Sequence, residues 1–277
     1  MTNFAYIETD MMEWEPDPGI PGFLSKPLYV DRETGAFTQI HFVPPGWGEE
    51  ILEGKPYRHY HASVYERSFC LFGDFPHWEF KDPADTDGEM IVFRGGVFMD
   101  RPPMTIHGLM PEPKSAGGAT TLSWNTGAGV SVRDPKAKDE TFVIPFEDTR
   151  GINLEFTSPR IFQTADVAWE NHPTISGWKI KPLCERAGVA GEAALISIPP
   201  DWQPDGQHTV RGGDVLTWLF VVSGDVAVQI GDGAATTKLA LKDRSYLNWD
   251  RTVSLRLASK PVSRGGAVVL CVGHNLT

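Results

Sequence analysis

The stretch that decides the fold runs from residue 54 to residue 73 and reads GKPYRHYHASVYERSFCLFG. It contains two histidines, His59 and His61, with one residue between them, and a carboxylate, Glu66, after four more residues. Side chains at positions i and i+2 of a strand face the same side, so both imidazoles are expected to project together, about 7 Å apart along the chain. A hairpin after this strand would bring Glu66 beside them.

A second stretch, RGGVFMDRPPMTIHG at residues 94–108, adds a third histidine, His107. Three neutral imidazoles and one carboxylate are typical ligands of a divalent transition metal, and they leave one or two coordination positions for water or substrate. The sequence therefore predicts a metal site made of His59, His61, Glu66 and His107.

Together the two stretches resemble the two motifs of the cupin superfamily. The first motif is matched, with its first gap one residue short, by Gly54-x4-His59-x-His61-x4-Glu66-x6-Gly73. The second is matched by Gly96, Pro102 and His107, but Met104 stands where the motif has its second glycine, and Pro111 where an Asn often follows. The resemblance implies a small β-barrel of the jelly-roll type whose four motif residues bind one metal ion.

The chain also repeats itself. A shift of 155 residues places Trp14-Glu15 on Trp169-Glu170, Lys26-Pro27-Leu28 on Lys181-Pro182-Leu183, and Pro44-Pro45-x-Trp47 on Pro199-Pro200-x-Trp202. Further on, Phe69-x3-Gly73-Asp74 matches Phe220-x3-Gly224-Asp225 at a shift of 151. The sequence therefore predicts two copies of one domain, residues 1–155 and 156–277, in a bicupin arrangement.

Composition supports an all-β fold. Gly 28 and Pro 22 are high counts for 277 residues and favour short strands joined by turns. Residues 37–43 and 193–198 are β-rich runs that end in Pro-Pro, which cannot continue a strand ladder. We expect two β-barrels and no helix longer than about two turns.

The second copy lacks the metal ligands. At a shift of 151, Val210, Gly212 and Thr217 take the positions of His59, His61 and Glu66. A separate alignment of residues 94–108 with residues 242–256 puts Leu255 opposite His107. The second barrel is therefore predicted to be metal-free and to serve as a packing partner, a dimer surface or a lid. His208 lies near this position and is predicted to be a loop or edge residue.

Other features narrow the setting. The formal net charge of −11 offers no electrostatic footprint to nucleic acid or an anionic membrane, and no apolar run is long enough to span a bilayer. Three dispersed cysteines indicate buried thiols in a reducing compartment, and the acidic, broken amino end argues against a signal peptide. We expect a cytoplasmic protein with a small-molecule substrate, and a homodimer is open as its assembly. Cys70 is expected to be a buried, inert thiol, and His77 to be exposed.

The resemblance to cupin dioxygenases implies an enzyme. In this interpretation the metal binds an enolisable carbonyl, diketone or phenolic compound together with O₂, and Glu66 leaves the metal to act as a base. Fe(II) or Mn(II) is favoured by the resemblance, with Ni(II), Co(II) and Zn(II) also open. Two alternatives remain: an isomerase, lyase or hydrolase in which the ion is only a Lewis acid, or a non-catalytic cupin that senses a ligand or metal. An intact site beside a degenerate copy favours the enzyme.

Overall fold

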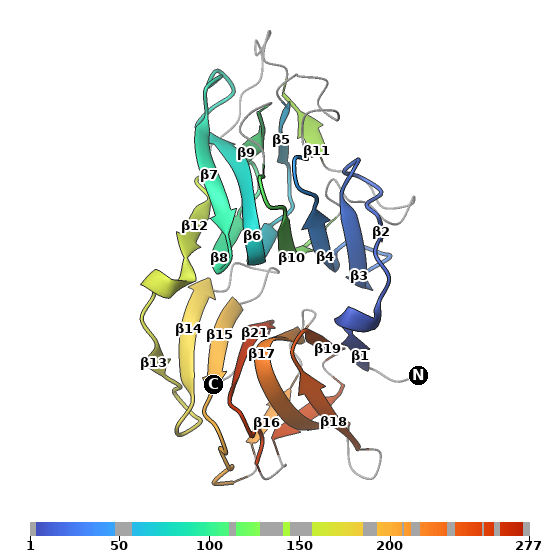
Figure 1. Ribbon diagram of the computed structural model, residues 1–277, viewed down its shortest axis with the longest axis vertical. Coiled ribbons are helices and arrows are strands. Elements are labelled where there is room, and N and C mark those ends of the chain that lie inside the picture. Colours follow the sequence, from blue (N-terminus) through green and yellow to red (C-terminus); the bar gives the residue numbers. More distant parts are fainter. Residues whose placement is uncertain are drawn as a thin grey trace. The chain divides into compact units, whose positions relative to one another are not determined.

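The computed structural model describes residues 4–47, 57–110, 115–127, 141–144, 157–184, 193–206, 208–211, 217–231, 236–250, 252–257 and 261–273. The chain forms two compact units, seen in Figure 1 as two groups of curved strands. Residues Glu13–Asp166 form one unit, here called the first barrel, and Met1–Met12 with Val167–Thr277 form the other, the second barrel. Gly54, Pro111, Gly212 and the boundary predicted at residue 155 lie outside the described residues.

The first barrel is an antiparallel sheet in which β6 is the longest strand. Its strands are β2 (Glu15–Pro16), β3 (Leu24–Val30), β4 (Phe37–Val43), β5 (Tyr57–His61), β6 (Glu66–Phe80), β7 (Glu89–Arg94), β8 (Val97–Arg101), β9 (Ile106–Leu109), β10 (Ala119–Asn125), β11 (Thr141–Val143) and β12 (Arg160–Gln163). They follow the order β11-β5-β9-β6-β10-β4-β3-β2, with β7 and β8 also on β6 and β12 on β8.

The second barrel repeats this arrangement around β17. Its strands are β1 (Phe4–Glu8), β13 (Glu170–Asn171), β14 (Lys179–Cys184), β15 (Ala193–Ile198), β16 (His208–Arg211), β17 (Thr217–Ile230), β18 (Thr237–Lys242), β19 (Ser245–Trp249), β20 (Ser254–Leu257) and β21 (Ala267–Val272). The order is β1-β19-β17-β21-β15-β14-β13, with β18 and β20 on β17 and β16 on β20.

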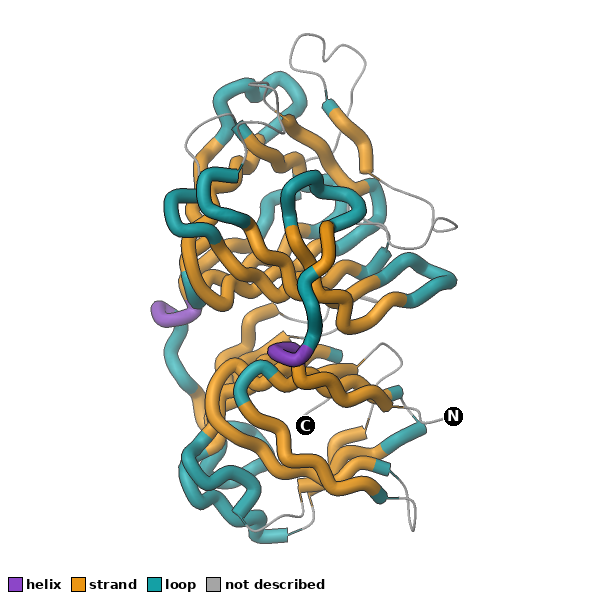
Figure 2. Tube along the Cα trace, turned by 45° about the vertical axis from the view of Figure 1, so that its right-hand side comes forward, coloured by secondary structure: helices purple, strands orange, loops and turns teal. Residues whose placement is uncertain are grey.

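Helix is scarce, as the composition predicted. Figure 2 shows two short helical turns, the 3-10 helices η1 (Thr9–Met11) and η2 (Thr164–Asp166). Within the described segments no helix is long and apolar enough to cross a membrane. The predicted all-β fold of two barrels is confirmed.

The internal repeat reappears as identical strand register. Lys26 on β3 pairs with Ile40, and Lys181 on β14 pairs with Leu195, which is the same pairing shifted by 155 residues. Each of these lysines also lies over the ring of the repeated tryptophan, Trp14 or Trp169. The matched segments of sequence therefore form one framework twice.

The two copies exchange their leading strands. By the repeat, β1 corresponds to β12, yet β1 pairs with β19 of the second barrel while β12 pairs with β8 of the first. The compact units therefore differ from the predicted ranges of 1–155 and 156–277, because each copy's leading strand completes the sheet edge of the other copy. Local sequence similarity does not reveal such an exchange.

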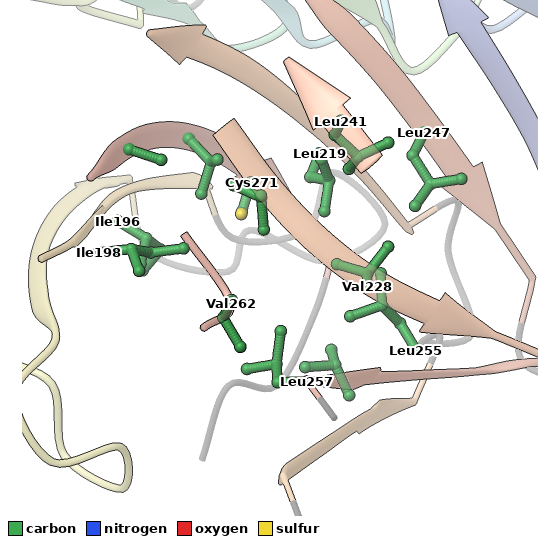
Figure 3. Close-up of a cluster of buried hydrophobic side chains, with 14 of the residues drawn as sticks. Ile196, Ile198, Leu219, Val228, Leu241, Leu247, Leu255, Leu257, Val262 and Cys271 are labelled. Carbon is green, nitrogen blue, oxygen red and sulfur yellow. The ribbon is translucent and has the colours of Figure 1, made fainter. Parts of the chain in front are cut away.

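The two barrel interiors are filled differently. In the second barrel, apolar side chains from several strands point toward one another and form one large buried cluster, including Leu219, Val228, Leu247 and Leu255 (Figure 3). In the described part of the first barrel, some of the buried apolar residues form smaller clusters, for example those around Trp47, Phe93 and Phe80. Buried histidine, arginine and glutamate side chains lie among them.

Candidate metal centre

Three of the four predicted ligands meet inside the first barrel. His59 and His61 lie on β5, His107 lies on β9, and His59 is the direct cross-strand partner of His107. All three side chains are buried, and each offers one ring nitrogen within 4.8 Å of the others. The i, i+2 spacing on one strand and the neighbouring strand's register account for this convergence.

Neighbouring groups orient two of the rings. His107 Nδ1 donates to the carbonyl oxygen of Thr105 at 3.0 Å, which leaves the Nε2 lone pair for a ligand. His61 Nδ1 lies 3.2 Å from the hydroxyl of Thr141, its cross-strand partner on β11.

The donor set fits a divalent transition metal. His59 Nδ1 is buried and has no hydrogen-bond partner among the described residues, so a polar ring nitrogen of the cluster is left unsatisfied by the protein. Burial, followed by the neighbouring His107 and His61, holds the pKa of His59 well below its usual value. The ring is therefore neutral at pH 7, as metal ligation requires.

Glu66 lies beside the three nitrogens, at the start of β6. Its Oε2 is 3.1 Å from His107 Nε2 and accepts a hydrogen bond from Arg101 Nη1 at 2.9 Å. Burial raises the pKa of Glu66, but Arg101 and His107 together outweigh that effect and hold it well below its usual value. The carboxylate is thus ionised and faces the cluster.

A buried network behind Glu66 was missed by the sequence analysis. Arg101 lies on β8, is 2% exposed, and donates to Glu79 as well as to Glu66. Its Nη2 also lies 2.9 Å from His77 Nδ1. Burial lowers the pKa of Arg101, but Glu79 and Glu66 raise it by more, so the guanidinium stays charged.

The prediction that His77 is exposed was wrong. His77 is 8% exposed and its ring centroid lies 5.6 Å from that of His107. Because Arg101 can only donate, Nδ1 of His77 accepts, and burial followed by the Arg101 charge lowers the pKa of His77 well below its usual value. The alternation of His77 and Glu79 along β6 placed both on one face, and that signal was available in the sequence.

A cavity of about 360 Å³ adjoins the centre. His59, His107, Glu66 and Arg101 form part of its lining, and Phe23, Trp47, Phe75 and Phe93 form much of the apolar remainder. This volume suits a small organic molecule.

Comparison with solved structures extends over almost the whole chain. A Streptomyces albus HEPD structure with 2-hydroxyethylphosphonate and Fe(II) bound matches with a TM-score of 0.61 and 10% identity, covering 99% of this chain and 77% of that one. Oxalate decarboxylase from Lactobacillus farciminis, in a formate complex, matches with a TM-score of 0.59 and 12% identity, covering 98% and 86%. Bacillus subtilis oxalate decarboxylase, in a study of its Mn(II) centres, matches with a TM-score of 0.58 and 10% identity, covering 98% and 77%.

The fold is that of a bicupin. At these identities the likeness concerns the fold. No family model matches the chain, and no curated protein matches it by sequence.

In the second cupin barrel apolar residues take the positions of two of the predicted ligands, His59 and His107. Val210 on β16 pairs with Leu255 on β20, in the same register as His59 and His107. His208 lies on the strand β16 and contacts Asp205 at 2.7 Å. Among the residues described there, no group of three metal-binding side chains comes together.

Cys70 of the first cupin barrel is buried, as expected. Burial raises the pKa of its thiol to about 12, so the reactive thiolate is scarce at neutral pH. This fits the inert role predicted for it.

Proposed function

We propose that the protein is a metal-dependent cupin enzyme of the dioxygenase type, acting on a small enolisable carbonyl, diketone or phenolic compound. The observation that carries this proposal is the convergence of His59, His61 and His107 beside the ionised Glu66, at the wall of a cavity. His59, His61, Glu66 and His107 would hold one ion, with Fe(II) or Mn(II) favoured. The fold neighbours that hold Fe(II) and Mn(II) support this choice of metals.

The charge of the site supports an enolate-like substrate. The two carboxylates and one guanidinium of Glu66, Glu79 and Arg101 leave one formal negative charge, and the buried His59 ring is neutral. A divalent ion would turn this into one net positive charge, which a singly deprotonated enol, diketone or phenol neutralises. When bound, the metal would polarise the substrate oxygens and provide a template for both reactants.

The chain's own groups supply positioning and a dry environment. Arg101 keeps Glu66 ionised and fixed, and the Thr105 carbonyl fixes the His107 tautomer. The aromatic lining, including Phe75 and Phe93, keeps bulk water away from the substrate. The base role predicted for Glu66 stays a prediction, and its low pKa favours the ligand role over proton abstraction.

The test combines elemental analysis of the full-length protein with O₂ uptake on a panel of diketones and catechols. We expect about one Fe or Mn per chain and uptake that His61→Ala abolishes. The matched control is His208→Ala, on the corresponding strand of the second barrel, which should retain both metal and uptake. Bound metal without O₂ uptake on any compound would replace this proposal with Lewis-acid chemistry. Absence of metal would contradict the metal centre itself.

We also propose a cytoplasmic location. All three cysteines, Cys70, Cys184 and Cys271, are buried thiols outside any disulfide bond, which suits a reducing compartment.

A further inference from the structure

A line of polar side chains follows β10 along the cavity. Thr121, Ser123 and Asn125 alternate on one face of the strand, line the cavity and are each more than nine-tenths buried. The Asn125 Oδ1 atom is buried with no hydrogen-bond partner among the described residues. The hydroxyls of Thr121 and Ser123 lie 3.3 Å apart, and Ser123 also donates to Ser68 Oγ at 3.3 Å. A buried polar group costs free energy unless it is paired, so the line favours a ligand that brings a polar group of its own.

This line of side chains runs from the proposed metal centre to another histidine, His41. Asn125 pairs across the sheet with Glu66, and Thr121, four residues earlier, pairs on the other side with His41 of β4. Four residues of strand span about 13 Å. His41 therefore lies at the opposite end of the polar line from Glu66.

His41 is held by a buried carboxylate. Asp17 Oδ2 lies 3.2 Å from His41 Nε2, and the Asp17 side chain is 0% exposed. The other carboxylate oxygen of Asp17 has a structural task, since it accepts hydrogen bonds from the backbone N–H groups of Gly19 and Ile20. The turn therefore explains Oδ1 but not the contact of Oδ2 with His41.

In the second barrel the turn is closed without a carboxylate–histidine contact. Asp17 corresponds there to His172, whose Nδ1 accepts from the backbone N–H groups of Thr174 and Ile175 and so closes the same turn. The position of His41 is taken by Ile196, which is buried in the apolar cluster. Strand register confirms the correspondence, because His41 pairs with Thr121 as Ile196 pairs with Val269. The turn thus persists without a polar pair, and in the first barrel His41 of the pair lines the cavity.

We propose that His41, oriented by Asp17, together with Thr121 and Ser123 forms a second subsite that binds an uncharged hydroxyl, carbonyl or amide group of the ligand. An anionic group is disfavoured, because Asp17 offsets any charge on His41 and Arg101 already contacts Glu79 and Glu66. Among the described residues that line the cavity, Arg101 is the sole arginine or lysine.

Taken with the proposed function, on which this step rests, the subsite narrows the substrate class. The substrate would have an enolisable or phenolic group at the metal end and a neutral hydrogen-bonding group at the other end. An apolar middle would lie against Phe23 and Phe75, whose ring centroids are 5.9 Å apart.

The experiment uses 4-fluorophenol, fluorobenzene and 4-fluorobenzoate as probes, titrated into the metal-stripped full-length protein and followed by ¹⁹F NMR. We expect 4-fluorophenol to bind roughly fivefold to tenfold more tightly than fluorobenzene, the effect of one hydrogen bond. The benzoate should bind no more tightly than fluorobenzene. His41→Leu should remove the preference for the phenol while fluorobenzene still binds, which also shows that the cavity is intact.

Two further variants keep the test decisive. Asp17→Asn retains an oxygen for the turn and should still lower the preference, because the carboxylate that orients His41 is lost. His59→Ala, at the metal end of the cavity, should keep the preference for 4-fluorophenol over fluorobenzene. A preference that survives both His41→Leu and Asp17→Asn, or its absence in the wild-type protein, would overturn the subsite. A preference that depends on His41 in a protein that binds no metal would keep the subsite and contradict the proposed function.

Discussion

In the first barrel His59 faces His107 across neighbouring strands, and in the second barrel Val210 faces Leu255 in the same register. At most matched interior positions an apolar residue of the second barrel takes the place of a polar one, and at the position of Glu66 the second barrel has the uncharged Thr217. The pairs, first barrel then second, are Gln39 and Ala194, His41 and Ile196, Glu66 and Thr217, His77 and Val228, Arg101 and Trp249, Thr121 and Val269, and Ser123 and Cys271.

The framework, by contrast, is common to both barrels. Gly73 and Gly224 both have positive φ, and a Cβ on either would lie within about 2 Å of the carbonyl oxygen of Gly118 or Gly266. Trp47 and Trp202 each donate from the indole to a backbone carbonyl 26 residues earlier, of Pro21 and Ser176. The comparison teaches that turns and register maintain the fold, whereas the inward-facing positions decide between a packed core and a site.

The largest expected effect is a difference in metal content between variants of the first barrel and matched variants of the second. His59→Ala and His107→Ala should each lower bound metal by at least tenfold, following removal of one nitrogen from a three-nitrogen cluster. Val210→Ala, the matched change in the second barrel, should leave metal content unchanged. Elemental analysis of purified full-length variants measures both. Loss of metal in the Val210 variant would show that the second barrel takes part in the site.

Core truncation should cost more in the second barrel. Leu247 lies in the continuous apolar cluster, so Leu247→Ala is expected to cost about 2–5 kcal/mol. Its counterpart Met99 borders the cavity and lacks neighbours on that side. The cost of Met99→Ala should therefore be lower than that of Leu247→Ala by roughly 1 kcal/mol or more. Hydrogen exchange resolved by peptide reports each barrel separately. An equal loss at both positions would mean that the cavity does not loosen the first barrel.

Acid should weaken the first barrel more steeply. In metal-stripped protein, burial lowers the pKa of His59 and His77. Below a pH of about 6.5, the pKa of a histidine in the unfolded chain, the unfolded chain therefore binds more protons than the folded one. Stability should therefore be level above that pH and fall as pH decreases through it. In the second barrel, His172 is the described histidine whose pKa burial lowers, so its slope should be roughly half as steep.

Hydrogen exchange between pH 5 and 8 tests whether the first barrel loses stability more steeply than the second. Earlier opening of β17 and β20 than of β5 and β9 on acidification would contradict it.

The smallest expected effect concerns the shared turn. Asp17→His copies the residue of the second barrel and should change stability by less than about 1 kcal/mol, because His172 Nδ1 closes the equivalent turn. Asp17→Ala, which removes the acceptor, should cost on the order of 1 kcal/mol. Thermal denaturation of the two variants compares them. A larger loss for Asp17→His would show that the pairing with His41 contributes to stability as well as to the site.

Much of this protein could be read from its sequence. Strand alternation fixes His59 and His61 on one face, and the repeat at 155 residues predicts a second barrel with the same register. The loss of the ligand residue types at the matched positions of that copy predicts a barrel without a metal centre, and this stays a prediction. The inferences on strand alternation and on the repeat succeed because they depend on spacing within a strand or on similarity between segments, and both are local properties of the chain.

Other features were decided by the tertiary structure. Arg101 reaches Glu79 and Glu66, Asp17 reaches His41, and β1 and β12 each join the other copy's sheet. Such contacts join residues far apart in the chain, and many partners are compatible with any one spacing. They are set when the sheets close and the interior must pair every buried charge, which is a condition on the whole barrel. The sequence determined where the predicted metal ligands lie; the closed barrel determined which buried groups hold them and what else lines the cavity.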